Sequence, residues 1–123
     1  MEKLTKEFVV SATDTAEKLG SGDLAVLATP RLVAMMENTA KNMLDLASNM
    51  TSVGFIMEMK HLAPSPVGAQ IIVTAEILER GERTVDFTLS AYAGDTLIAT
   101  ANHQRVIVNR LKFMEKIQNK PIM

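Results

Sequence analysis

Three residues of this sequence carry side chains that suit acid–base or nucleophilic chemistry. Glu37 lies on the border of an apolar stripe of helical period, so we predict that its carboxylate is half-buried. His61 ends a stretch of alternating residues and is in phase with the apolar side of that stretch. Thr29 precedes Pro30, a pair that favours a helix start in which the Thr hydroxyl caps a backbone N–H. Together they could supply a base or nucleophile, an acid and a hydrogen-bonding hydroxyl.

The residues after Thr29 predict one long amphipathic helix over residues 30–48. Apolar side chains recur there at helical spacing, whereas charged and amide side chains fall on the opposite side. The apolar positions are Val33, Met36, Ala40, Met43, Leu44 and Ala47. Glu37 stands next to this stripe and not among the solvated charges.

The remaining segments predict one strand before the helix and four strands after it. Residues 4–12 have the pattern of a short strand, and residues 13–19 that of one helical turn closed by the Gly20-Ser21-Gly22 stretch. Alternation over residues 53–61 puts Val53, Phe55, Met57 and Met59 on the face of His61. Further strands are predicted over residues 69–79, 84–91 and 96–108, and the tail from residue 110 is a short helix or a frayed end.

The last predicted strand carries His103 and Arg105 on the same side as its aliphatic residues. Because Arg is almost never buried without a partner, Arg105 needs an acceptor on that side. Glu37, His61 and His103 form a second possible set, since two imidazoles and one carboxylate can bind zinc. They lack the short spacing typical of such sites, and we therefore predict no metal centre.

The amino-acid composition disfavours several classes of protein. The 123 residues, 47% of them hydrophobic, predict a single domain over residues 1–123. A net charge of -1 and 4% aromatic residues disfavour nucleic-acid binding. The sequence has no Cys, no signal-peptide pattern at its start and no apolar run of the ~20 residues that span a membrane. We expect a cytoplasmic protein that does not bind membranes.

The order of elements predicts an α+β protein of the hotdog fold, in which one long central helix is wrapped by an antiparallel sheet of about five strands. One helix can cover only the concave face of such a sheet. The sheet then keeps free edges, which two protomers can pair. We therefore expect a homodimer or a higher homo-oligomer.

Three stretches resemble the hotdog acyl-CoA thioesterases related to fluoroacetyl-CoA thioesterase, over nearly the whole chain. They run from residue 26 through Glu37, from residue 51 through His61, and over residues 101–105. The resemblance implies that Thr29, Glu37 and His61 are catalytic, and that Gly54 and Arg105 contact the substrate. It also implies hydrolysis of a small or medium acyl-CoA to the free acid and CoA, with CoA entering as part of the substrate and no separate cofactor. The alternative is a non-catalytic hotdog module that binds acyl-CoA.

Each of these residues also has a structural interpretation. Thr29 can act as a helix cap alone, and His61 can be a satisfied histidine at the end of a strand. Gly54 can mark a bulge or a close backbone approach. In the enzyme that gives the family its name, selectivity is associated with a phenylalanine-bearing lid before the helix, whereas residues 16–28 here contain no aromatic residue. We therefore expect no selectivity for fluoroacetyl-CoA.

Overall fold

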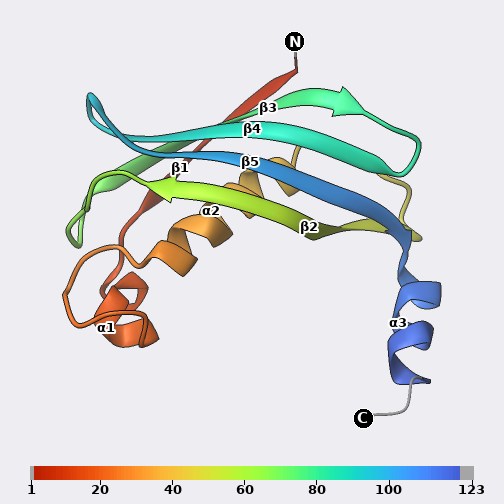
Figure 1. Cartoon of the computed structure of the whole chain (residues 1–123), viewed down its shortest axis with the longest axis horizontal. Helices are drawn as coiled ribbons and strands as arrows, with labels where there is room; N and C mark the ends of the chain where they lie inside the picture. Colours follow the sequence, from red (N-terminus) through yellow and green to blue (C-terminus); the bar gives the residue numbers. More distant parts are fainter. Residues whose placement is uncertain (1, 120–123) are drawn as a thin grey trace.

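The computed structural model describes residues 2–119 and contains a curved, five-stranded antiparallel sheet with a helix on its concave side (Figure 1). The strand order in the sheet is β1-β3-β4-β5-β2. The strands are β1 (Lys3–Val9), β2 (Met50–His61), β3 (Gln70–Arg80), β4 (Thr84–Ala93) and β5 (Thr96–Asn109). The helices are η1 (Ala12–Asp14), α1 (Ala16–Leu19), α2 (Thr29–Lys41) and α3 (Arg110–Gln118). The predicted order of elements is confirmed.

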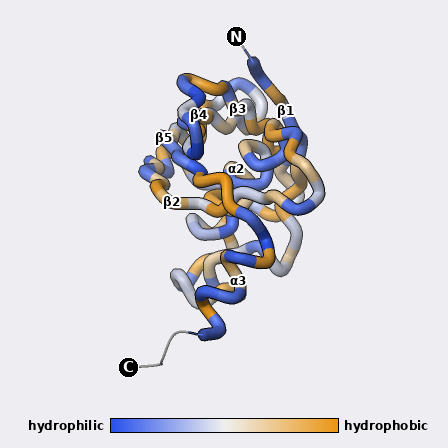
Figure 2. Tube along the Cα trace, turned by 90° about the vertical axis from the view of Figure 1, so that its right-hand side faces the viewer, coloured by the Kyte–Doolittle hydropathy of each residue, from blue (hydrophilic) through white to orange (hydrophobic). Residues whose placement is uncertain are grey.

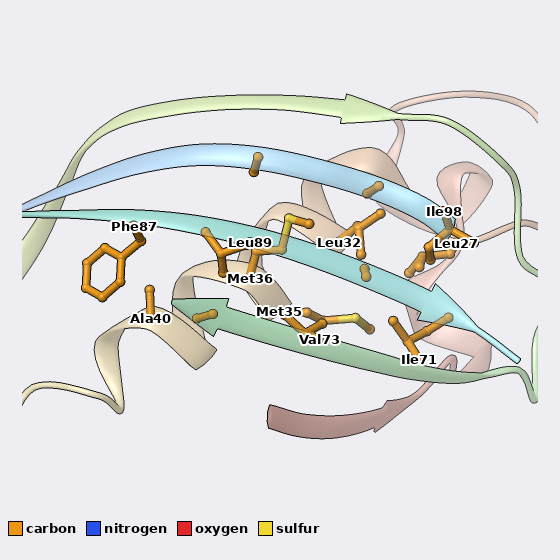
Figure 3. Packing of buried hydrophobic residues seen from close by; sticks show 14 of the residues in the cluster. Leu27, Leu32, Met35, Met36, Ala40, Ile71, Val73, Phe87, Leu89 and Ile98 are labelled. Atoms are coloured by element: carbon orange, nitrogen blue, oxygen red, sulfur yellow. The ribbon is translucent and has the colours of Figure 1, made fainter. Parts of the chain in front are cut away.

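The core lies between α2 and the concave face of the sheet. Figure 3 shows Leu32, Met35 and Met36 of α2 pointing towards Val73 of β3 and Leu89 of β4, and all five side chains are buried. Alternate residues of β3 and β4 are buried because successive side chains of a strand point to opposite faces. Burying each such side chain stabilises the fold by about 1.5–3 kcal/mol. This packing fixes α2 across the sheet.

Helix α2 is shorter than the sequence predicts. It spans thirteen residues and ends at Lys41, not at Ser48. Asn42, Asp45 and Asn49 follow the helix, and these residue types compete with helical hydrogen bonds through their own side chains. Met43 and Leu44 nevertheless pack against the core from non-helical backbone. The helical spacing of Met43 and Leu44 therefore predicted correctly that both side chains are partly buried. It predicted wrongly that both residues are helical.

Strand β2 contains a bulge that the sequence analysis placed only as one interpretation of Gly54. Its register with β5 shifts between Gly54 and Ile56, so Phe55 has no partner and is 71% exposed. Before the bulge Ser52 faces inwards and is buried. The predicted common face of Val53 and Phe55 with His61 is therefore wrong, because the extra residue changes which positions face the core.

The two edge strands of the sheet, β1 and β2, each pair with one other strand. Strand β2 pairs with β5, and β1 at the other border pairs with β3. Seen along the sheet, the strands curve around α2, with α3 extending away from them (Figure 2). Helix α3 covers part of the tail that was predicted as a short helix or frayed end, and residues 120–123 lie outside the described residues. No helix within residues 2–119 is long and apolar enough to span a membrane.

Candidate active site

Thr29 and His61 meet where α2 begins and β2 ends. The Thr29 Oγ1 atom lies 2.8 Å from His61 Nδ1. Ala28 is the N-cap residue of α2 and no side chain caps this helix end. The predicted cap role of Thr29 is therefore wrong, because Thr29 already belongs to the first helical turn and its hydroxyl bonds the imidazole. We call these two residues the hydroxyl–imidazole pair.

The hydroxyl–imidazole pair borders a cavity of about 330 Å³ that is also lined by Val26 and Pro64. Removal from water lowers the pKa of His61 below its usual value, and the backbone of Ala63 partly opposes this effect. The imidazole is therefore neutral at pH 7, with one donor and one acceptor nitrogen, so the Thr29 hydroxyl can match either tautomer. The Nε2 atom is buried without a hydrogen-bond partner among the described residues.

Glu37, Gly54 and Arg105 form a second group, which we call the carboxylate cluster. Arg105 Nη1 lies 3.8 Å from Glu37 Oε2 in an ion pair. The guanidinium side chain is only 8% exposed, whereas the Glu37 side chain is 38% exposed, as the sequence predicted for a half-buried residue. A Cβ atom at position 54 would lie 2.6 Å from Glu37 Oε2. A side chain at position 54 would therefore force the Glu37 carboxylate to move, whereas glycine leaves it in its present place beside Arg105.

Two further residues hold Arg105, and the sequence analysis did not assign them this role. The Arg105 Nε and Nη2 atoms donate to the hydroxyl and the carbonyl oxygen of Ser52, at 2.8 and 3.1 Å. On the other side, Arg105 Nη1 is 3.3 Å from His103 Nε2. Burial lowers the pKa of Arg105 and the Glu37 carboxylate raises it. In the sequence, Ser52 is recognisable only as a small polar residue two positions before Gly54. The assumed alternation placed Ser52 on the outer face of the sheet.

The two groups lie apart within one protomer. Thr29 and Glu37 are eight residues apart on α2, which corresponds to about 12 Å along a helix. The structure thus joins Thr29 with His61, and Glu37 with Gly54 and Arg105, but it does not join all five. Within residues 2–119, no three His, Cys, Asp or Glu side chains are grouped closely enough to hold a metal ion.

Comparison with known proteins identifies the family. The sequence profile of the family described as fluoroacetyl-CoA-specific thioesterase matches residues 10–111. The chain belongs to this family. The predicted resemblance is confirmed over most of the sequence, which includes both the hydroxyl–imidazole pair and the carboxylate cluster.

Individual proteins match this chain over almost their full length. The fluoroacetyl-CoA thioesterase of Streptantibioticus cattleyicolor is 29% identical, with 97% of this chain and 91% of that protein covered. A solved structure of fluoroacetyl-CoA thioesterase matches with a TM-score of 0.90 at 29% identity, covering 98% of this chain and 96% of that one. A hot-dog-like protein from Thermanaerovibrio acidaminovorans matches with a TM-score of 0.87 at 21% identity, covering 98% and 93%. These matches confirm the hotdog fold.

The Thr29–His61 contact predicts a measurable coupling. In a double-mutant cycle of Thr29→Ala and His61→Ala, we expect a coupling energy of about 0.5–1.5 kcal/mol in the free energy of unfolding, measured by urea titration. The Thr29→Ser variant keeps the hydroxyl and should stay within about 0.5 kcal/mol of the wild type. Strictly additive losses would show that the Thr29–His61 contact does not contribute to stability.

Proposed function

We propose that this chain is an acyl-CoA thioesterase that hydrolyses a small or medium acyl thioester to the free acid and CoA. The observation that carries the proposal is the Glu37 carboxylate, which is half-buried against Gly54 and beside Arg105 in a chain of the thioesterase family. CoA enters as part of the substrate, and we propose no further cofactor. The cytoplasmic location stays a prediction from the sequence.

The carboxylate cluster provides the attacking group. The Glu37 carboxylate either attacks the thioester carbonyl carbon to form an anhydride or removes a proton from the attacking water. Both routes end with the C–S bond broken, the oxygen of water in the acid or the enzyme carboxylate, and a proton on the thiol. Arg105 holds the substrate by a carbonyl or phosphate oxygen, because its fork of N–H donors fits such acceptors.

The oxyanion that develops on the thioester oxygen needs donors, and the bulge in β2 offers backbone N–H groups for this purpose. Gly54 leaves the backbone open to approach, and the register shift leaves Phe55 unpaired in the ladder with β5. His61 relays a proton from solvent to the leaving thiolate, while the Thr29 hydroxyl orients the imidazole or the attacking group. Thr29 lies on α2, and Gly54, Phe55 and His61 lie on β2.

The active unit in this proposal is a homodimer. Strand β2 is at the edge of the sheet and carries Gly54 near its middle and His61 at its end. Gly54 and His61 lie at equal sequence distance from the midpoint of Met57 and Glu58. A twofold axis close to that midpoint, through one of these two residues, would pair two β2 strands antiparallel and bring the Gly54 segment of one protomer beside the His61 end of its partner. The carboxylate cluster would then face the partner's hydroxyl–imidazole pair.

The first test replaces Glu37 with Gln, which keeps the shape of the side chain and removes its charge. We expect kcat to fall by at least about 100-fold, with folding unchanged by circular dichroism and acyl-CoA binding retained in calorimetry. Glu82→Gln, which changes an exposed carboxylate in the turn between β3 and β4, is the matched control and should keep full activity. Wild-type turnover in Glu37→Gln would remove the catalytic role. A wild-type protein that binds but never hydrolyses acyl-CoA would be the non-catalytic binding module.

A second test asks whether the site is shared between protomers. Glu37→Gln and His61→Ala proteins, each of low activity, are unfolded together and refolded as a mixture. If each site takes Glu37 from one protomer and His61 from the other, a mixed dimer holds one intact site, and activity should recover to about a quarter of the wild-type value at equal mixing. Mixtures that stay as inactive as the separate variants would show that both residues act within one protomer.

The third test concerns the acyl group. Residues 16–28, which include α1, contain no aromatic side chain, and one fluorine contributes only about 1–3 kcal/mol in a hydrophobic pocket even at close contact. We therefore expect fluoroacetyl-CoA and acetyl-CoA to be hydrolysed with kcat/KM values within about 100-fold of each other. Thiol release from acetyl-, fluoroacetyl-, butyryl- and phenylacetyl-CoA measures this directly. A larger preference for fluoroacetyl-CoA would mean that something other than lid aromatics provides selectivity.

A further inference from the structure

His103 and Arg105 are neighbours on the inner face of β5, and the structure fixes the protonation of the imidazole. The His103 Nδ1 atom lies 2.7 Å from the carbonyl oxygen of Ile56. A carbonyl can only accept, so Nδ1 carries the proton. In the neutral ring Nε2 is then an acceptor, and Arg105 Nη1 donates to it at 3.3 Å.

The imidazole is held firmly in this orientation. His103 is 3% exposed, and its ring stacks on Phe87 with the centroids 5.8 Å apart. Its bond to Ile56 reaches the residue directly after the unpaired Phe55. The ring therefore links the β2 bulge to the guanidinium group of Arg105.

The guanidinium group of Arg105 has hydrogen-bond partners on two sides. Ser52 accepts from Nε and Nη2, whereas the Nη1 atom is shared between His103 and Glu37. The distance from Nη1 to the Glu37 carboxylate is 3.8 Å, too long for a hydrogen bond. Nη1 carries two N–H groups, but while it is bonded to His103 it lies outside hydrogen-bond distance of the carboxylate.

We propose that His103 is a positioning residue that keeps Arg105 from closing onto Glu37. The imidazole holds Nη1 at the distance where the positive charge still stabilises the carboxylate but leaves its oxygens open to the substrate or to water. Without that acceptor, Arg105 would form a direct hydrogen bond to Glu37, and a carboxylate bound in this way is a weaker base and nucleophile. The inference rests on the proposed function, because it assigns a use to the free carboxylate oxygens.

Two substitutions of His103 test its contact with Ile56 and its contact with Arg105 independently. In His103→Asn the amide N–H₂ can still reach the Ile56 carbonyl, but the acceptor for Arg105 is lost. In His103→Gln the longer side chain can place an acceptor near the position of Nε2. Gln104→Asn is the matched control, since Gln104 points to the opposite face and donates to Asp86.

Steady-state kinetics with acyl-CoA should distinguish the variants. We expect His103→Asn to lower kcat by about 10- to 100-fold with little change in KM, the scale of a reacting group displaced by about 1 Å. His103→Gln should restore kcat to within a few fold of the wild type, and Gln104→Asn should not change it. Arg105→Ala, by contrast, should mainly raise KM. Equal kcat values for His103→Asn and the wild type would overturn the inference, as would losses of the same size in the Asn and Gln variants.

Nitrogen-15 spectra of labelled His103 add a readout that does not depend on turnover. We expect the shifts of a neutral ring protonated on Nδ1 alone at pH 7, and a ring protonated on Nε2 would overturn the proposed bond to Arg105. If the wild type hydrolyses no acyl-CoA while the spectrum shows the Nδ1 proton, the proposed function fails and the arrangement of His103 and Arg105 stands. A hydrolysing enzyme with the opposite tautomer would refute the positioning role alone.

Discussion

The buried guanidinium group of Arg105 is the constraint on which the site depends. A charge removed from water is costly unless it is paired and hydrogen-bonded, and Arg105 is 6% exposed. Ser52 and His103 supply acceptors, while Glu37 supplies the opposite charge. The Glu37 carboxylate faces the guanidinium across position 54, and a side chain there would displace it. One buried cation therefore determines the residues on α2, β2 and β5 that surround it.

The carboxylate cluster and the hydroxyl–imidazole pair have opposite electrostatic characters. The first is an ion pair between a buried guanidinium and a partly solvated carboxylate. In the second, burial lowers the pKa of His61, so the ring is neutral there. Thioester hydrolysis needs both a negative oxygen for attack and a group that exchanges protons with the leaving thiol. In the proposed reaction these two requirements fall to separate environments, one at Glu37 within α2 and the other where α2 begins.

Much of this arrangement follows from the sequence, and the failures have identifiable causes. Periodicity predicted the strands, the half-buried Glu37 and the shared face of His103 and Arg105, and the Thr29-Pro30 pair predicted the start of α2. It failed at the end of α2, because Met43 and Leu44 are partly buried without being helical. It also failed for the partner of Thr29, because a contact between the first residue of a helix and the last residue of a distant strand leaves no local pattern. The resemblance supplied these residues as a set, but not their contacts.

The bulge explains how one strand can serve both groups. Gly54 and His61 are separated by an odd number of positions, so in a regular strand they would point to opposite faces of the sheet. The unpaired Phe55 shifts the register by one residue, and both Gly54 and His61 then face the side of α2. A strand without the bulge could provide the open backbone beside Glu37 or the imidazole beside Thr29, but not both. The irregularity in β2 is thus what allows a single edge strand to present two separate chemical groups on one face.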